Sequence, residues 1–228
     1  MTRAVVFDLW DTLVDFDPEL SRGFTHRLAD RLGRDRGEFE QLWLEGRSVR
    51  DTGPLGEYLT SLGVEEDARE ELVSIRRDWA RCALVPRAGA VETLRELRAR
   101  GIGTGLLSVC SDDVPAVWAE TRLQGLFDAE IFSCDVGLRK PDPRIYLLTC
   151  ERLEVEPAEA LFVGDGANEE LAGAERVGMR EALIHRPGQE PIWAEARGFR
   201  GPVAHVRSGG VEPALMRPCL RDRSAMSP

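Results

Sequence analysis

A short apolar run that ends in an aspartate constrains the fold of this chain more than any other segment. The run extends from Ala4 to Phe7 and is followed by Asp8, Asp11 and Thr12. Such a run, bounded by turn-forming residues, is typical of a buried strand. In an open α/β sheet, ligands bind beyond the carboxyl ends of the strands. We therefore expect Asp8 to face a ligand rather than to be an arbitrary surface charge.

From about residue 85 onward, short apolar runs alternate with segments of helical periodicity. The predicted strands in this part of the chain are 102–107, 131–132, 160–163, 182–184 and 203–206. Strands that are separated by helices imply right-handed crossovers and a largely parallel sheet. The predicted fold class is therefore α/β, with a Rossmann-like parallel sheet core flanked by helices.

The segment between the first strand and this α/β region has a different pattern. Its apolar residues recur at helical spacing, as in Leu20, Phe24 and Leu28, and no part of it resembles a strand. The simplest interpretation is a small all-helical cap that leaves the sheet and returns to it, forming a lid over Asp8. The predicted division is an α/β core of residues 1–15 and 85–217, a helical cap of residues 16–84, and a flexible tail of residues 218–228.

Composition excludes several classes of protein. The chain has 228 residues, of which 43% are hydrophobic, and no apolar run approaches membrane-spanning length. A net charge of −10 argues against nucleic acid as a partner. The five cysteines are scattered without a CxxC pair, and no signal peptide precedes the first strand. These features favour free thiols and a cytoplasmic location over a disulfide framework or a zinc site. Nothing in the sequence identifies a protein partner.

Further polar residues follow the other predicted strands in a fixed order. Ser108 ends the second strand, Lys140 begins a Lys-Pro-Asp-Pro segment, and Asp165 follows Gly164 after a later strand, with Glu170 shortly beyond. Taken with Asp8 and Thr12, this order resembles the haloacid dehalogenase (HAD) superfamily of hydrolases. That superfamily combines Asp-x-Asp-x-Thr with a strand-end Ser or Thr, a Lys and a final acidic pair. The resemblance covers roughly residues 4–185 and implies a helical cap after the first motif.

The resemblance implies an enzyme that hydrolyses a small-molecule substrate. Asp8 would attack the substrate to form an aspartyl-enzyme intermediate, which water then hydrolyses. Magnesium prefers oxygen ligands, and Asp8 and Asp165 are its natural ligands here. The family also uses the backbone carbonyl two residues after the nucleophile, which Trp10 can supply. The family's spacing adds Glu170, either as a metal ligand or beside the metal.

Two residues of the resemblance would hold the transferred group. The Ser108 hydroxyl would donate to a phosphoryl oxygen, and the Lys140 ammonium would neutralise charge in the transition state. Several arginines lie in the predicted cap and could contact an anionic substrate from the lid. Arg47 is the candidate among them.

One residue departs from the superfamily pattern. Trp10 stands where phosphatases of the superfamily have the aspartate that protonates the leaving group, and indole does not titrate. Either Asp11 or a cap residue takes this role, or the substrate is not a phosphate monoester. Haloacid dehalogenases carry an aromatic residue here, because halide leaves without a proton.

Three hypotheses remain open on the sequence alone. The preferred one is a magnesium-dependent phosphatase of small phosphorylated metabolites. The second is a metal-independent 2-haloacid dehalogenase, which Lys140 and Tyr146 favour. Dehalogenases, however, lack the Gly-Asp found at 164 and 165, and they place an asparagine where Val109 stands. The third is a catalytically silent binding protein, favoured by Trp10 and opposed by the retained polar residues.

Overall fold

The computed structural model describes residues 2–185 and 203–205 of the chain. Within them, six parallel strands form one sheet in the order β3-β2-β1-β4-β5-β6. Their bounds are β1 Ala4–Phe7, β2 Gly103–Ser108, β3 Ala129–Phe132, β4 Ala160–Gly164, β5 Arg180–His185 and β6 Val203–His205. This arrangement confirms the predicted α/β fold class with a parallel core. The predicted tail of residues 218–228 lies outside the described residues.

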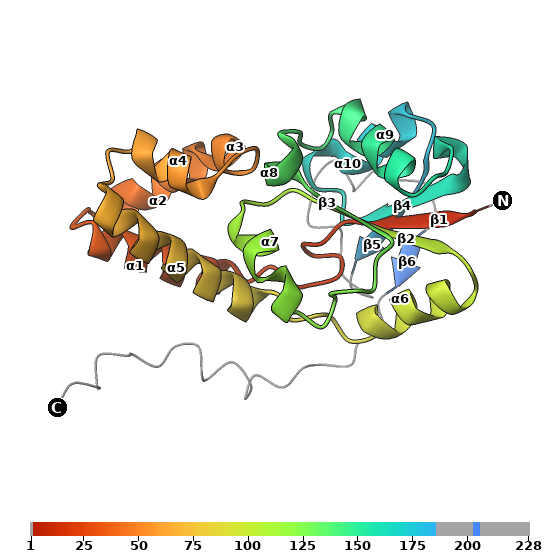
Figure 1. Ribbon diagram of the computed structural model, residues 1–228, viewed down its shortest axis with the longest axis horizontal. Coiled ribbons are helices and arrows are strands. Elements are labelled where there is room, and N and C mark those ends of the chain that lie inside the picture. Colours follow the sequence, from red (N-terminus) through yellow and green to blue (C-terminus); the bar gives the residue numbers. More distant parts are fainter. Residues whose placement is uncertain (1, 186–202, 206–228) are drawn as a thin grey trace.

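Helices cover both faces of the sheet. In Figure 1, α6 lies below the sheet, and α9 and α10 lie above it. The helices of this region are α6 Ala90–Ala99, α7 Asp113–Val117, α8 Ser133–Val136, α9 Pro143–Arg152 and α10 Glu170–Arg176. Val5 and Phe7 of β1 belong to the apolar cluster on one face, and Val6 belongs to the cluster on the other. Burial on both faces explains why the strand is a continuous apolar run.

The chain between β1 and α6 forms a helical insert at one end of the sheet (Figure 1). Its helices are α1 Pro18–Arg31, α2 Arg36–Glu45, α3 Arg47–Arg50, α4 Leu55–Ser61 and α5 Glu66–Ala83. The insert has its own apolar cluster, which includes Leu28, Phe39 and Leu72. Asp17 caps α1 through its carboxylate, which accepts hydrogen bonds from the Glu19 and Leu20 backbone N–H groups.

Two segments between strands are not continuous α-helices. After β2, α7 ends at Val117 and the 3-10 turn η1 Trp118–Glu120 follows it. After β4, the chain first forms the 3-10 turn η3 Ala167–Glu169, and α10 starts at Glu170. Asn168 and Glu169 have φ values of 52° and 55°, so the backbone cannot continue as a right-handed helix through them.

The described cysteines follow the sequence prediction in part. Cys110, Cys134 and Cys150 are buried free thiols, as expected. Cys82 is disulfide-bonded, so the prediction of free thiols is wrong at that position. Cys219 lies outside the described residues. None of the helices that the structure describes has the length and apolar character needed to cross a membrane.

The contact between α9 and α10 depends on a glycine. A Cβ atom on Gly173 would lie 2.5 Å from the Tyr146 hydroxyl, and Tyr146 is fully buried. We expect Gly173→Ala to lower the free energy of unfolding by about 1–3 kcal/mol through overpacking. Gly23 of α1 is the control, because a Cβ there meets nothing within 4 Å. Gly23→Ala should raise stability by about 0.5–1 kcal/mol. Urea denaturation measures both, and equal effects would contradict this account of the packing.

Candidate active site

The carboxyl ends of β1, β2 and β4 bring the predicted polar residues to one edge of the sheet. β1 pairs with both neighbours, and Phe7 lies opposite Leu106 of β2 and Val163 of β4. Asp8 therefore follows β1 directly between the ends of those two strands, and Asp165 follows β4. The parallel order of the sheet explains why residues so distant in the sequence meet here.

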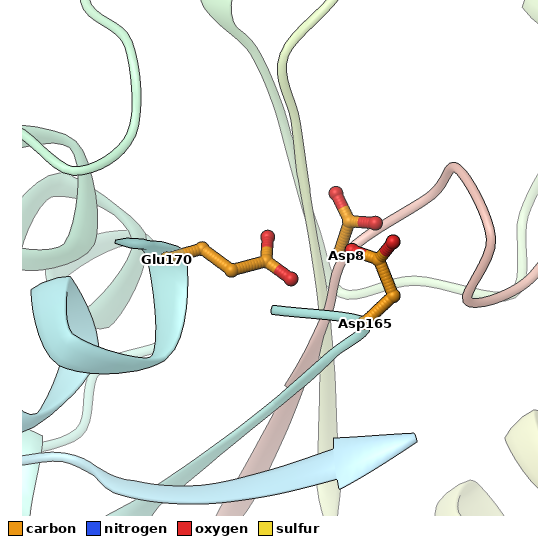
Figure 2. A group of neighbouring side chains, drawn as sticks. All are labelled: Asp8, Asp165 and Glu170. Carbon is orange, nitrogen blue, oxygen red and sulfur yellow. The ribbon is translucent and has the colours of Figure 1, made fainter. Parts of the chain in front are cut away.

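Three buried carboxylates gather at this edge. Asp8, Asp165 and Glu170 each offer an oxygen atom, and these atoms all lie within 4.8 Å of one another. Figure 2 shows the three side chains pointing toward one another. Their exposed fractions are 5%, 5% and 1%. Oxygen atoms this close suit a hard divalent cation, whose ligands lie about 2.1 Å from the metal for magnesium. The residues predicted from the sequence to bind metal are thus close enough to share one ion.

A single ammonium group lies among these carboxylates. The Lys140 Nζ atom donates hydrogen bonds to Asp8 Oδ1 and Glu170 Oε2, both at 2.5 Å. Burial alone would lower the pKa of Lys140, but the charges of Asp8 and Glu170 outweigh it and raise that pKa above its ordinary value. Lys140 is also the only lysine in the chain, beside 29 arginines. The site uses a compact ammonium where the rest of the protein uses guanidinium groups.

Glu170 is held from both sides. Its Oε1 atom accepts a hydrogen bond from the Gly166 backbone N–H at 3.0 Å, while Oε2 accepts from Lys140. A Cβ atom on Gly164 would lie 2.0 Å from Oε1, so only glycine leaves room for this carboxylate. Burial raises the pKa of Glu170 well above its usual range, Lys140 opposes this shift, and Asp8 and Asp165 add to it. Because both of its carboxylate oxygens accept hydrogen bonds, Glu170 primarily holds the Lys140 ammonium and the backbone at Gly166 in position.

Asp11 and Trp10 lie beside this cluster rather than in it. Asp11 Oδ1 accepts a hydrogen bond from the Phe16 backbone N–H at 3.2 Å and lies 3.4 Å from an Arg87 nitrogen. Burial raises the pKa of Asp11, and the bond from Phe16 and the charge of Arg87 oppose that shift. The Trp10 ring packs against Trp79, with ring centroids 5.3 Å apart. The side chain of Trp10 is thus part of an aromatic wall.

The two predicted hydroxyl residues are more deeply buried than a substrate contact requires. Ser108 is 0% exposed and Thr12 is 1% exposed. Among the described residues, neither hydroxyl oxygen has a hydrogen-bond partner. Val109, Cys110 and Ser111, rather than Ser108, line the adjoining cavity. Ser108 ends β2 and Thr12 lies in the turn after β1, and their contact with substrate stays a prediction.

A cavity of about 200 Å³ connects the carboxylates to the helical insert. On the sheet side its lining includes Asp8, Asp11, Lys140, Asp165 and Glu170. On the insert side it includes Trp43, Arg47, Arg50, Asp51, Arg76 and Trp79. The predicted Arg47 is among these residues, half exposed and 3.4 Å from Asp51. Sequence reasoning missed Asp51 and Arg76, although a signal for Arg76 existed, since a charged residue interrupts the apolar stripe of Leu72 and Trp79.

Comparison with known proteins agrees with this geometry. Residues 2–178 match the haloacid dehalogenase-like hydrolase family. The chain belongs to that family and is a hydrolase.

The relatives divide between two chemistries. A phosphatase of Mycobacterium tuberculosis is 35% identical over 199 residues, covering 82% of this chain and 88% of the relative. An (S)-2-haloacid dehalogenase of Burkholderia cepacia is 27% identical over 205 residues, covering 83% and 85%. The crystal structure of a HAD phosphatase from Thermococcus onnurineus has a TM-score of 0.67 at 27% identity, covering 91% of this chain and 94% of that one. These matches establish the hydrolase family, and they include both a phosphatase and a haloacid dehalogenase.

The single lysine makes the electrostatics of the site measurable. With isotope-labelled lysine, we expect the side-chain NMR signal of Lys140 to remain that of an ammonium at pH 10.5, because neighbouring carboxylates raise its pKa. Glu170→Gln should lower the pKa of Lys140. Of its two hydrogen-bonded carboxylates, only Asp8 would then remain to oppose the effect of burial. Glu169→Gln is the matched control, because Glu169 is exposed and its carboxylate lies 3.9 Å from an Arg176 nitrogen. A Lys140 pKa that is unchanged in Glu170→Gln would refute the assigned pairing.

Proposed function

We propose that the protein is a magnesium-dependent phosphatase that acts on a small phosphorylated metabolite through an aspartyl-phosphate at Asp8. The observation that carries this proposal is the closeness of three buried carboxylates at the strand ends. Oxygen atoms of Asp8, Asp165 and Glu170 all lie within 4.8 Å of one another, and the Lys140 ammonium contacts two of them, Asp8 and Glu170. Carboxylates this close repel one another, and a divalent cation that binds oxygen ligands would offset the repulsion. A metal-independent dehalogenase would have no evident need for Asp165.

The residues that would hold magnesium are Asp8 and Asp165, with the backbone carbonyl of Trp10 as a third ligand. The ion would neutralise the substrate phosphate so that it can approach Asp8. Glu170, whose oxygens are engaged by Lys140 and Gly166, would act beside the metal. These assignments agree with the family pattern and with the closeness of the carboxylates.

Asp8 carries out the bond changes in this proposal. Lys140 holds Oδ1 of Asp8, and the other oxygen attacks phosphorus while the bond to the leaving alcohol breaks. Lys140 also neutralises charge on the phosphoryl oxygens, and Ser108 and Thr12 contribute their unpaired hydroxyls at the same edge. Water then attacks phosphorus, which releases inorganic phosphate and restores Asp8.

The helical insert, residues 16–84, acts as a lid over this reaction. Its residues form one wall of the cavity, and Asp51 of the insert lies 3.5 Å from Arg139, the neighbour of Lys140. A cavity closed by a lid excludes water from the reacting groups until the product forms. Arg47, at the same wall, is a candidate contact for the substrate.

The metal requirement gives the first test of the proposal. We expect release of inorganic phosphate from a panel of small phosphate monoesters in the presence of magnesium, and loss of that release with chelator. Asp8→Asn should abolish turnover, because the amide cannot form the intermediate. The activity is measured by phosphate detection, and each assay is run on folded protein verified by circular dichroism. Phosphate release that persists in chelator or in Asp8→Asn would contradict the proposal.

A second candidate function is favoured by Trp10. Its side chain lies in the aromatic wall and cannot act as a general acid for a leaving alcohol. A halide leaves without a proton and would not need such an acid. The dehalogenase relative supports the same reading. Halide release from a 2-halo acid in the presence of chelator, with no phosphate release from any ester, would establish this function. Binding of these ligands without turnover would instead identify a catalytically silent protein.

Asp11 is the proposed source of the missing proton. It lines the cavity and is the carboxyl group nearest in sequence to the residue that Trp10 replaces. We expect Asp11→Asn to lower kcat about 100-fold or more for alkyl phosphates, which need general acid catalysis. The same variant should affect an aryl phosphate with an acidic leaving group far less, since that group departs without a proton.

Asp51 of the insert provides the comparison. It also lines the cavity, is buried, and could donate a proton from the lid. Asp51→Asn should lower kcat for alkyl and aryl phosphates by the same factor if Asp11 is the acid. A fall in kcat that is larger for alkyl than for aryl phosphates in Asp51→Asn, but not in Asp11→Asn, would identify Asp51 as the general acid.

A further inference from the structure

Two buried arginines form the wall of the cavity opposite the carboxylates. Arg50 of α3 and Arg76 of α5 are 6% and 5% exposed, and both line the same cavity as Asp8. Charged residues are rarely buried unless they are paired. We call Arg50 and Arg76 the arginine pair, and their partners determine what this wall can bind.

One member of the arginine pair has unpartnered donors within the described residues. Arg76 Nη2 lies 2.8 Å from Asp113 Oδ2, but its Nε and Nη1 atoms are buried without a hydrogen-bond partner. Arg50 Nη1 donates to the Trp43 carbonyl oxygen at 2.5 Å. Burial and the charge of Arg76 together lower the pKa of Arg50 to about 10, although Tyr58 and Asp51 oppose the shift. Two neighbouring cations, one of them with unpartnered N–H donors beside a cavity, are arranged to receive an anion.

Aromatic rings hold both guanidinium groups in place. The Cζ atom of Arg50 lies 3.8 Å from the Trp43 ring centroid, and that of Arg76 lies 3.9 Å from the Trp79 ring centroid. The Arg76 Cζ atom also lies 5.4 Å from the Trp43 ring centroid. Stacking on an aromatic face fixes the plane of a guanidinium group and its forked donors. The wall is therefore preorganised, which lowers the entropic cost of binding a planar anion.

We infer that the arginine pair binds a carboxylate on the substrate, at the end opposite the phosphate that Asp8 attacks. This inference rests on the proposed phosphatase function and specifies its substrate class as a short phosphorylated carboxylic acid. A carboxylate is planar and matches the guanidinium fork with two parallel hydrogen bonds. The cavity of about 200 Å³ limits the chain between the two anionic groups to a few carbon atoms. Such a substrate would bind in one orientation, because the three carboxylates line the sheet side of the cavity and the arginine pair lines the insert side.

Binding of phosphonates tests this inference without any turnover. The probe is 3-phosphonopropionate, and the matched control ligand is propylphosphonate, which lacks the carboxylate. With magnesium present, the wild-type protein should bind the probe about 30-fold more tightly than the control ligand, the gain expected of one charged hydrogen-bonded pair. Titration calorimetry measures both dissociation constants, and the fluorescence of Trp43 and Trp79 should change with the probe.

Variants of Arg76 test the same claim. Arg76→Met should reduce the 30-fold preference to near unity, and Arg77→Met should retain it, because Arg77 is exposed on the same helix. Arg76→Lys keeps a cation beside Asp113 in case the methionine variant does not fold, and it should lose most of the preference because lysine lacks the fork. Equal binding of the two ligands by wild-type protein, or a preference that survives in both Arg76 variants, would overturn the inference.

Turnover separates this inference from the proposed function. Phosphate release from esters with and without a terminal carboxylate should differ in KM more than in kcat, since the arginine pair binds the end that does not react. Hydrolysis of all esters without a carboxylate preference would refute the arginine-pair assignment and leave the phosphatase proposal intact. Carboxylate-selective phosphonate binding without hydrolysis of any ester would refute the phosphatase proposal alone. Tighter binding of a propane bisphosphonate than of the carboxylate probe would also overturn the carboxylate assignment.

Discussion

The Lys140 ammonium, held between buried carboxylates, is the interaction on which the site depends. Lys140 donates to Asp8 and Glu170, and those two residues come from opposite ends of the described core. Removing the cation would leave like charges facing each other in a dry environment, which is strongly destabilising. In the proposed reaction the same contact orients Asp8, so the stability of the site and its chemistry both depend on Lys140. Lys140 is the only lysine in the chain, and the other 29 basic residues counted as Lys or Arg are arginines.

The charge distribution of the cavity then favours one orientation of a bound substrate. Asp8, Asp165 and Glu170 line its sheet side, and the insert side carries three arginines, Arg47, Arg50 and Arg76, beside one carboxylate, Asp51. Charges in a water-poor cavity act more strongly than on the surface. A substrate with one group that recruits a cation and another that pairs with arginine would bind in only one orientation. In the proposed function, the strand ends supply the chemistry and the helical insert selects the substrate.

The sequence predicted the parallel sheet and named the three carboxylates that the structure brings together, because both depend on local patterns. Apolar runs such as Ala4 to Phe7 show where strands end, and a parallel sheet brings those ends together. The arginine pair could not be predicted in the same way, since the burial of Arg76 depends on Asp113, which lies on another element. The depth of Ser108 and the break before Glu170 also escaped prediction. The break arises because Asn168 and Glu169 adopt positive φ values, which a right-handed helix cannot accommodate.

Direct capture of the intermediate tests the central claim that Asp8 attacks phosphorus. Turnover of a phosphate ester with magnesium would be stopped with acid, and the protein would then be reduced with borohydride. Reduction converts an acyl phosphate on aspartate to homoserine, which mass spectrometry of the Asp8 peptide identifies. The account predicts homoserine at position 8 with magnesium and none with chelator. An unmodified aspartate at position 8 while phosphate is being released would contradict it.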